Sequence, residues 1–217
     1  MVAADCVIFG YENDELKILL FHRTVEVAAG QWSLIGGFVQ EEESLEEAAE
    51  RILYKITGLQ NVFMEQVETF SKPYRDSGGR VISTVFYALI RIDQYAPVTF
   101  TEEYKACWVP VNQIPELVFD HNEMVKKAFE KLQFRASIDL VGKELLPEKF
   151  TLKQLRSLYE SFFQRTLDPG NFRKKVLSLN VLDRLEEKNP EGSKKGAYYF
   201  KYKDDLSERN TDRIIKI

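Results

Sequence analysis

The chain has 217 residues, of which 44% are hydrophobic and 29% are charged, and its formal net charge is −4. This composition is typical of a soluble globular protein, and no apolar run reaches the roughly 18 residues that a membrane helix needs. The two cysteines, Cys6 and Cys107, lie far apart in apolar segments, which predicts neither a disulfide framework nor a zinc site. We therefore expect a cytoplasmic protein with no membrane partner.

Charge is distributed unevenly along the chain. Residues 1–140 contain 13 Lys and Arg against 22 Asp and Glu, whereas residues 141–217 contain 17 against 12. A chain of this length can form one sizeable core and a second, smaller domain. We expect an acidic domain over residues 1–140 and a basic domain over residues 141–217, and the basic domain is the candidate for binding nucleic acid.

The first domain is predicted to contain strands and two helices. Apolar runs at residues 2–10 and 17–24 flank a turn-forming segment and indicate a hairpin, so the first run is expected to be a strand and not a signal peptide. A helix is expected within residues 119–132, with Asp120 as its N-cap. This order of elements favours an α+β sandwich with helices packed on the faces of a sheet. Further strands are expected at residues 31–38, 62–70, 80–92 and 106–111.

A helix after residue 43 has the clearest local signals. Ser44 and Glu47 have the spacing of a capping box, and Gly58 suits a helix that ends there. Acids at positions 46, 47 and 50 fall in the first turns, where they stabilise the positive end of the helix dipole. The apolar stripe of this helix is Leu45, Ala48, Ala49, Ile52 and Ile56.

The second domain is predicted to contain short helices and a hairpin. Thr151 can cap a helix over residues 152–163, and Asp168 followed by Pro169 is typical of the start of another. Residues 181–203 are predicted to form a hairpin with a basic tip. The apolar stripes of the two helices are Leu152, Leu155, Tyr159 and Phe162, and Phe172, Val176 and Leu179.

The segment from Gly37 to Leu59 resembles the signature of the Nudix hydrolases. The matching positions, with the family's spacing kept throughout, are Gly37, Glu43, Arg51, Leu53, Gly58 and Leu59. The three helix acids that gather Mg²⁺ in active members align with Ile52, Lys55 and Ile56. Two isoleucines supply no ligand and a lysine repels the ion, so we expect no metal, no cofactor and no enzymatic activity.

This resemblance implies an α/β/α sandwich with a mixed sheet and a cleft beside the signature. A hydrolase that uses the remaining acids, Glu43, Glu46, Glu47 and Glu50, is the alternative. The residues expected to line a ligand pocket are Arg23, Gln31, Trp32, Phe38, Glu43 and Arg51.

The second domain resembles a winged helix-turn-helix. Polar residues of the helix after Asp168 lie opposite its apolar stripe, where they could reach bases and phosphates in a major groove, and the hairpin would form the wing. The residues expected to contact DNA are Thr151, Lys153, Asn171, Arg173, Lys174, Lys175, Ser178, Lys194 and Lys195. An interaction module for an acidic protein remains open as another interpretation.

A degenerate Nudix domain followed by a winged helix resembles the Nudix-related transcriptional regulators. The resemblance implies a homodimer that binds a palindromic double-stranded operator and responds to a small molecule, a sugar in some members and ADP-ribose in others. Because the signature has lost the acids that hold a diphosphate through Mg²⁺, the sequence favours a sugar such as arabinose as the effector. ADP-ribose, with control of NAD metabolism, is the alternative, since arginines could bind a diphosphate directly.

Overall fold

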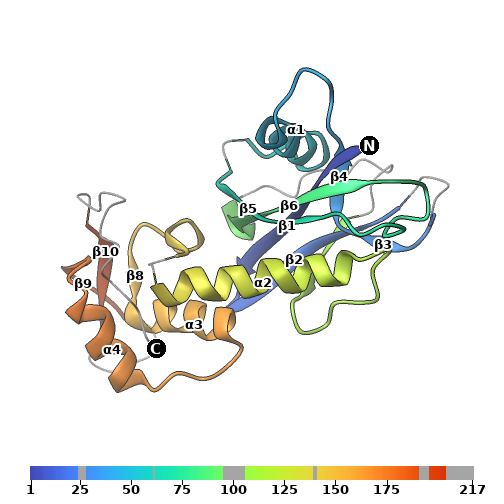
Figure 1. The fold of residues 1–217 in the computed structure, drawn as a ribbon. Coiled ribbons are helices and arrows are strands. Elements are labelled where there is room, and N and C mark those ends of the chain that lie inside the picture. The colour runs from blue at the N-terminus through green and yellow to red at the C-terminus, as the bar shows by residue number, and fades with distance from the viewer. Residues whose placement is uncertain (24–27, 61, 95–105, 139–140, 191–195, 204–217) are drawn as a thin grey trace. The chain divides into compact units, whose positions relative to one another are not determined.

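The computed structural model describes residues 1–23, 28–60, 62–94, 106–138, 141–190 and 196–203 (Figure 1). Contacts divide the chain into two units. Unit 1 comprises residues 1–12 and 16–131, and unit 2 comprises residues 13–15 and the chain from residue 132 onward. The division falls within helix α2 (His121–Ile138), nine residues before the composition boundary at residue 140.

Unit 1 is built on one mixed sheet. Strands β1 and β6 run parallel, and the other strand pairs with a described register are antiparallel. The order is β3-β2-β1-β6-β5, with β4 on β1 and β7 on β2. The strands of the described residues are β1 (Val2–Glu12), β2 (Glu15–His22), β3 (Trp32–Ser33), β4 (Ile35–Phe38), β5 (Met64–Phe70), β6 (Ile82–Arg91) and β7 (Ala106–Pro110), and a 3-10 helix η1 (Ile92–Gln94) follows β6.

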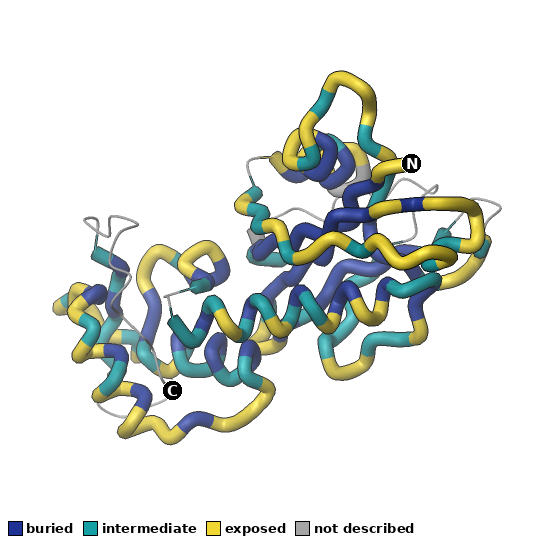
Figure 2. The backbone as a smooth tube through the Cα atoms, viewed as in Figure 1, coloured by how far each residue is buried: buried dark blue, intermediate teal, exposed yellow. Residues whose placement is uncertain are grey.

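Among the described residues, one helix packs on each face of this sheet. Successive side chains of β1 point alternately to the two faces and contact both helices. Cys6 and Ile8 belong to the core cluster that includes Ala49 of helix α1 (Leu45–Thr57). Phe9 points the other way and packs against Phe129 of α2, with ring centroids 6.0 Å apart. Figure 2 shows the central strands as the most deeply buried part of unit 1. The expected sandwich with a mixed sheet is confirmed.

Helix α1 has the predicted ends. The Ser44 hydroxyl accepts from the Glu47 amide, the Glu47 carboxylate accepts from the Ser44 amide, and Gly58 has the left-handed φ of 70° that ends the helix. In its apolar stripe Ala48, Ala49 and Ile52 are buried, whereas the side chain of Ile56 lies outside the described residues.

The expected single strand over residues 31–38 is wrong, because the segment forms two strands on different partners. Trp32 and Ser33 pair with β2, and residues 35–38 pair with β1. Between them, the backbone N–H of Leu34 donates to Nδ1 of His121 at 3.2 Å instead of joining a strand ladder. At the start of α2, the carboxylate of Asp120 binds the guanidinium of Arg75.

The described part of unit 2 contains the end of α2, the helices α3 (Leu152–Phe163) and α4 (Pro169–Ser178), and a small antiparallel sheet in the order β8-β10-β9. The rings of Tyr159 and Phe172 lie 5.8 Å apart and pack the two helices together. Asp168 caps the second helix through the Asn171 amide, with Pro169 at its first position, as predicted. The elements are η2 (Lys143–Leu145), β8 (Phe150–Thr151), α3 (Leu152–Phe163), α4 (Pro169–Ser178), β9 (Leu182–Asn189) and β10 (Ala197–Tyr202).

No helix in the described part of the chain is both long enough and apolar enough to cross a bilayer.

Candidate functional site

A cavity of about 410 Å³ opens in unit 1 beside the Nudix-like signature, a volume in the range of small-molecule sites. It brings together three of the six predicted ligand residues, Arg23, Phe38 and Arg51. The lining residues are Ala3, Asp5, Phe21, Arg23, Ser33, Leu34, Gly36, Gly37, Phe38, Arg51, Ile52, Lys55, Arg75, Asp76, Val81, Phe119 and His121.

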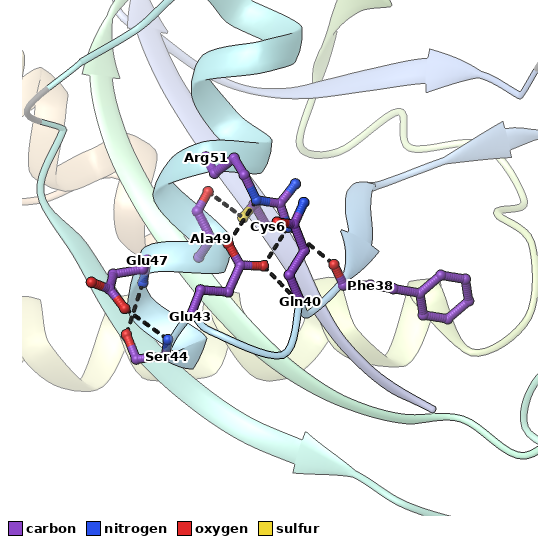
Figure 3. Close-up of polar contacts among 8 residues, drawn as sticks. All are labelled: Cys6, Phe38, Gln40, Glu43, Ser44, Glu47, Ala49 and Arg51. Carbon is purple, nitrogen blue, oxygen red and sulfur yellow. Dashed lines mark hydrogen bonds and ion pairs between the residues drawn. The ribbon is translucent and has the colours of Figure 1, made fainter.

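The loop between β4 and α1 is held by an ion pair between Glu43 and Arg51 (Figure 3). Arg51 Nε donates to Glu43 Oε2 at 2.7 Å, and Arg51 Nη2 donates to Oε1 at 2.5 Å and to the Phe38 carbonyl at 3.0 Å. The Gln40 amide also donates to Glu43. Chiefly because of the Arg51 hydrogen bonds, the pKa of Glu43 falls from 4.5 to about 2. Glu43 therefore braces the loop and does not line the cavity.

The other two predicted ligand residues, Gln31 and Trp32, are also absent from the cavity wall. Gln31 is exposed, and its carbonyl accepts from the Arg23 amide. The Trp32 ring packs on His22, with centroids 3.6 Å apart. The ring of Phe38 is 55% exposed and points away from the Glu43–Arg51 pair in Figure 3.

Two of the three residues that the sequence predicts in place of the family's acids, Ile52 and Lys55, line this cavity. The side chain of Ile52 is 3% exposed and belongs to the core cluster under α1. It packs so closely under Gly37 that a Cβ there would lie 3.2 Å from its side chain. Lys55 lies in the last turn of the helix, and none of the described residues forms an ion pair with it. At these two positions the cavity wall thus has an apolar side chain and an ammonium group.

The cavity wall also includes residues that the sequence did not single out. Phe119, just before α2, has a left-handed φ of 54°, which is strained for a bulky residue, and the Arg23 guanidinium lies 5.3 Å from its ring centroid. Arg75 is 4% exposed and forms two hydrogen bonds to Asp120. Asp5 could have been identified from the sequence as a candidate wall residue, because it is the acid within the apolar run of residues 2–10. No local sequence pattern identifies Arg75 or Phe119.

The charged groups of the wall favour an anionic ligand. The wall contains the cations Arg23, Arg51, Lys55 and Arg75 and the acids Asp5 and Asp76. Arg51 and Arg75 also pair with Glu43 and Asp120, and the Asp76 carboxylate accepts from the Gly78 amide. Among the described residues, no group of three or more His, Cys, Asp or Glu side chains is arranged to hold a metal ion. Direct binding of phosphate oxygens by arginine and lysine is the chemistry that these groups support.

In unit 2 the predicted DNA-contact residues of α4 form an exposed polar face. Phe172 and Val176 are buried at 2% and 1% exposure, while Asn171, Arg173, Lys174 and Ser178 are exposed and Lys175 is half-buried. Lys153, in the first turn of α3, is also exposed. The helix therefore presents its cations outward.

The remaining predicted DNA-contact residues are placed differently. Thr151 is 5% exposed, and its hydroxyl accepts from the Gln154 amide, so its side chain caps α3. Lys194 and Lys195 lie outside the described residues. The sequence did not single out Arg184 and Lys188 of β9, whose charged groups each lie 4.6 Å from the ring centroid of Tyr198. Arg184 and Lys188 are four residues apart, which places them on the same face of a strand, and this spacing could have identified them in the sequence.

Comparison with known proteins shows matches over both units. Residues 1–128 match the NUDIX domain, and residues 142–202 match the NrtR DNA-binding winged helix domain. The ADPR responsive transcriptional repressor NtrR of Acinetobacter baylyi is 27% identical over 203 residues, 92% of this chain and 81% of that protein.

Two solved structures of Shewanella oneidensis NrtR are also similar. NrtR complexed with a 27mer DNA has a TM-score of 0.80 at 29% identity and covers 93% of both chains. Its NUDIX domain complexed with ADP ribose has a TM-score of 0.52 at 33% identity, over 61% of this chain and 88% of that one.

The ion pair between Glu43 and Arg51 predicts a pH-dependent stability. Because the folded-state pKa of Glu43 is depressed, its stabilising effect is complete above about pH 4.5 and is lost as the pH falls toward 2. Thermal unfolding of wild type and Glu43→Gln should therefore differ most above pH 5, with the variant less stable, and the two should converge at lower pH. Glu41→Gln, on an exposed neighbour, is the control and should show no such convergence. A pH-independent difference for Glu43→Gln would contradict the assignment.

Proposed function

We infer the function of this chain from its architecture, because it belongs to the Nudix domain family and carries an NrtR-type winged helix domain after that domain. It matches a solved regulator bound to DNA over nearly its whole length. The chain is therefore an NrtR-like DNA-binding regulator.

We propose that ADP-ribose is the effector of this regulator. The single observation that carries this proposal is the cationic wall of the unit 1 cavity, where Lys55 replaces a metal-binding acid beside Arg51. A diphosphate can be bound by these side chains without Mg²⁺. Relatives described as ADPR responsive and as complexed with ADP ribose support the same ligand. This alternative is therefore favoured over the sugar that the sequence preferred.

The cavity also has groups for the other parts of ADP-ribose. The half-exposed ring of Phe38 offers an apolar face to a nucleobase, and Phe119 provides a second aromatic surface. A free pentose carries no anionic group for the Lys55 ammonium to bind. A ligand that joins a base, a diphosphate and sugars uses aromatic, cationic and polar groups together.

Binding without hydrolysis follows from the same positions. Mg²⁺ needs several carboxylate or phosphate oxygens, and Ile52 supplies core packing where a hydrolase would supply an oxygen. The Lys55 ammonium would repel the ion from the remaining acids. We propose that the domain recognises its ligand and releases it unchanged.

The proposed DNA-bound form is a homodimer on a palindromic operator in the cytoplasm. The exposed residues of α4 enter the major groove, and the cations of β9 lie against the phosphate backbone. Two such helices would read half-sites about 34 Å apart, one turn of DNA. Ligand binding then changes the preference between dimer arrangements and so changes DNA affinity.

Calorimetry with ADP-ribose and arabinose tests the effector. ADP-ribose should bind in the absence of Mg²⁺, arabinose should not bind, and incubation with Mg²⁺ should release no AMP. On a duplex selected from a random pool, ADP-ribose should change the affinity of the protein for DNA. If arabinose binds and ADP-ribose does not, the assignment of ADP-ribose as effector is refuted. Release of AMP that depends on Mg²⁺ would refute the absence of catalysis.

The proposed base contact gives a second prediction. Stacking of a base on an aromatic ring contributes roughly 1–3 kcal/mol, so Phe38→Ala should weaken ADP-ribose binding about tenfold. Phe63→Ala is the matched control, because Phe63 is 53% exposed and is not part of the cavity wall. Equal affinities of the two variants, measured by calorimetry, would exclude Phe38 from the base contact.

The DNA interface gives a third prediction. Replacing Lys174 by Ala should weaken binding to the selected duplex and lower the slope of log affinity against log salt by about one for each protomer. The control is Lys126→Ala, an exposed lysine of α2 in unit 1. Mobility shifts over a salt series measure both slopes, and an unchanged slope for Lys174→Ala would remove α4 from the interface.

A further inference from the structure

The wall of the cavity contains a buried carboxylate whose hydrogen bonding is incomplete. Asp5 of β1 is 7% exposed, and its Oδ2 accepts from the Ser83 hydroxyl at 2.5 Å. Its Oδ1 lies directly against Gly36, where a Cβ would come within 1.9 Å of it. None of the described residues donates a hydrogen bond to Oδ1. Asp5 lines the cavity, so Oδ1 is an acceptor that a ligand with a donor group can use.

The imidazole of His121 lines the same cavity and has one tautomer available. It is 4% exposed, and its Nδ1 accepts the backbone N–H of Leu34 and lies 3.3 Å from the Ser33 hydroxyl oxygen. Because a backbone N–H can only donate, Nδ1 holds a lone pair and the neutral ring has its hydrogen on Nε2. No described residue accepts that hydrogen.

The charge state of His121 agrees with this tautomer. Burial is the main cause that lowers its pKa, and the cations Arg75 and Arg23 lower it further, whereas Asp5 and Asp120 act in the opposite direction. At neutral pH the ring is therefore uncharged and does not neutralise Asp5. Asp5 lies against Gly36 and His121 contacts Leu34, so an unused acceptor and an unused donor flank one short segment of the wall.

We propose that Asp5 Oδ1 and His121 Nε2–H bind the vicinal hydroxyls of a ribose, one hydroxyl donating to the carboxylate and the other accepting from the imidazole. This inference rests on ADP-ribose as the effector. A carboxylate repels phosphate, so the diphosphate takes the cationic part of the wall and neutral hydroxyls take Asp5. ADP-ribose has two riboses, and both present this diol.

Asp5→Asn tests the carboxylate. Asparagine keeps an oxygen for the Ser83 hydroxyl and turns an N–H₂ group, which cannot accept, toward the diol. Loss of a hydrogen bond to a charged group should weaken ADP-ribose binding about tenfold or more. If Asp5 only stood near the ligand, removing its charge would relieve repulsion of the diphosphate, and affinity would stay the same or increase. The sign of the change therefore separates the two cases.

The experiment is calorimetry of the full-length chain with ADP-ribose and with ADP, which lacks the terminal ribose. Weaker binding of both ligands by Asp5→Asn assigns the diol to the adenosine ribose, and weaker binding of ADP-ribose alone assigns it to the terminal ribose. The control is Glu65→Gln, a carboxylate outside the cavity that accepts from the Tyr87 hydroxyl at 2.9 Å. It should leave both affinities unchanged.

A second variant keeps the inference testable if Asp5→Asn does not fold. In His121→Asn the side-chain oxygen can replace Nδ1 as acceptor for Leu34, while the Nε2 donor is lost, so ADP-ribose binding should weaken about fivefold. ADP-ribose affinities within twofold of wild type in the folded variants would overturn the diol site and leave the effector assignment standing. Absence of ADP-ribose binding by wild type would overturn the effector, and the diol site with it.

Discussion

The ion pair between Glu43 and Arg51 is the interaction on which the ligand cavity depends. It joins the end of the loop after β4 to the middle of α1, and Arg51 extends the connection to the Phe38 carbonyl at the start of the loop. Through these contacts Arg51 holds the loop against the helix.

Two residues of α1 set the chemistry of this part of the cavity wall. Ile52 extends the core beneath Gly37, and Lys55 adds a positive charge at the end of the helix. The scaffold that brings a diphosphate to a metal is thereby suited to bind a diphosphate by itself. Binding energy that a hydrolase would use on the transition state can instead stabilise one state of the protein.

The arrangement of unit 2 follows from local sequence signals to a greater degree than that of unit 1. Capping by Asp168, the proline that follows it and the buried Phe172 and Val176 fix which face of α4 is exposed. The lysines and arginine of that face follow directly from helical periodicity. This is why the sequence alone could locate the polar face of α4, and it also predicted that Thr151 caps α3.

Local sequence patterns predicted most of the order of the helices and strands, both ends of α1 and the start of α4, because caps and periodicity act over a few residues. The tertiary structure decided which side chains form the cavity. Arg75, Phe119 and His121 come from a loop and the start of α2, 70 or more residues from Asp5 on β1. Gln31 and Trp32 are adjacent to the wall in sequence but are turned away by the break between β3 and β4. Such a meeting of distant segments depends on strand pairing and packing across the whole sheet, which no local pattern encodes.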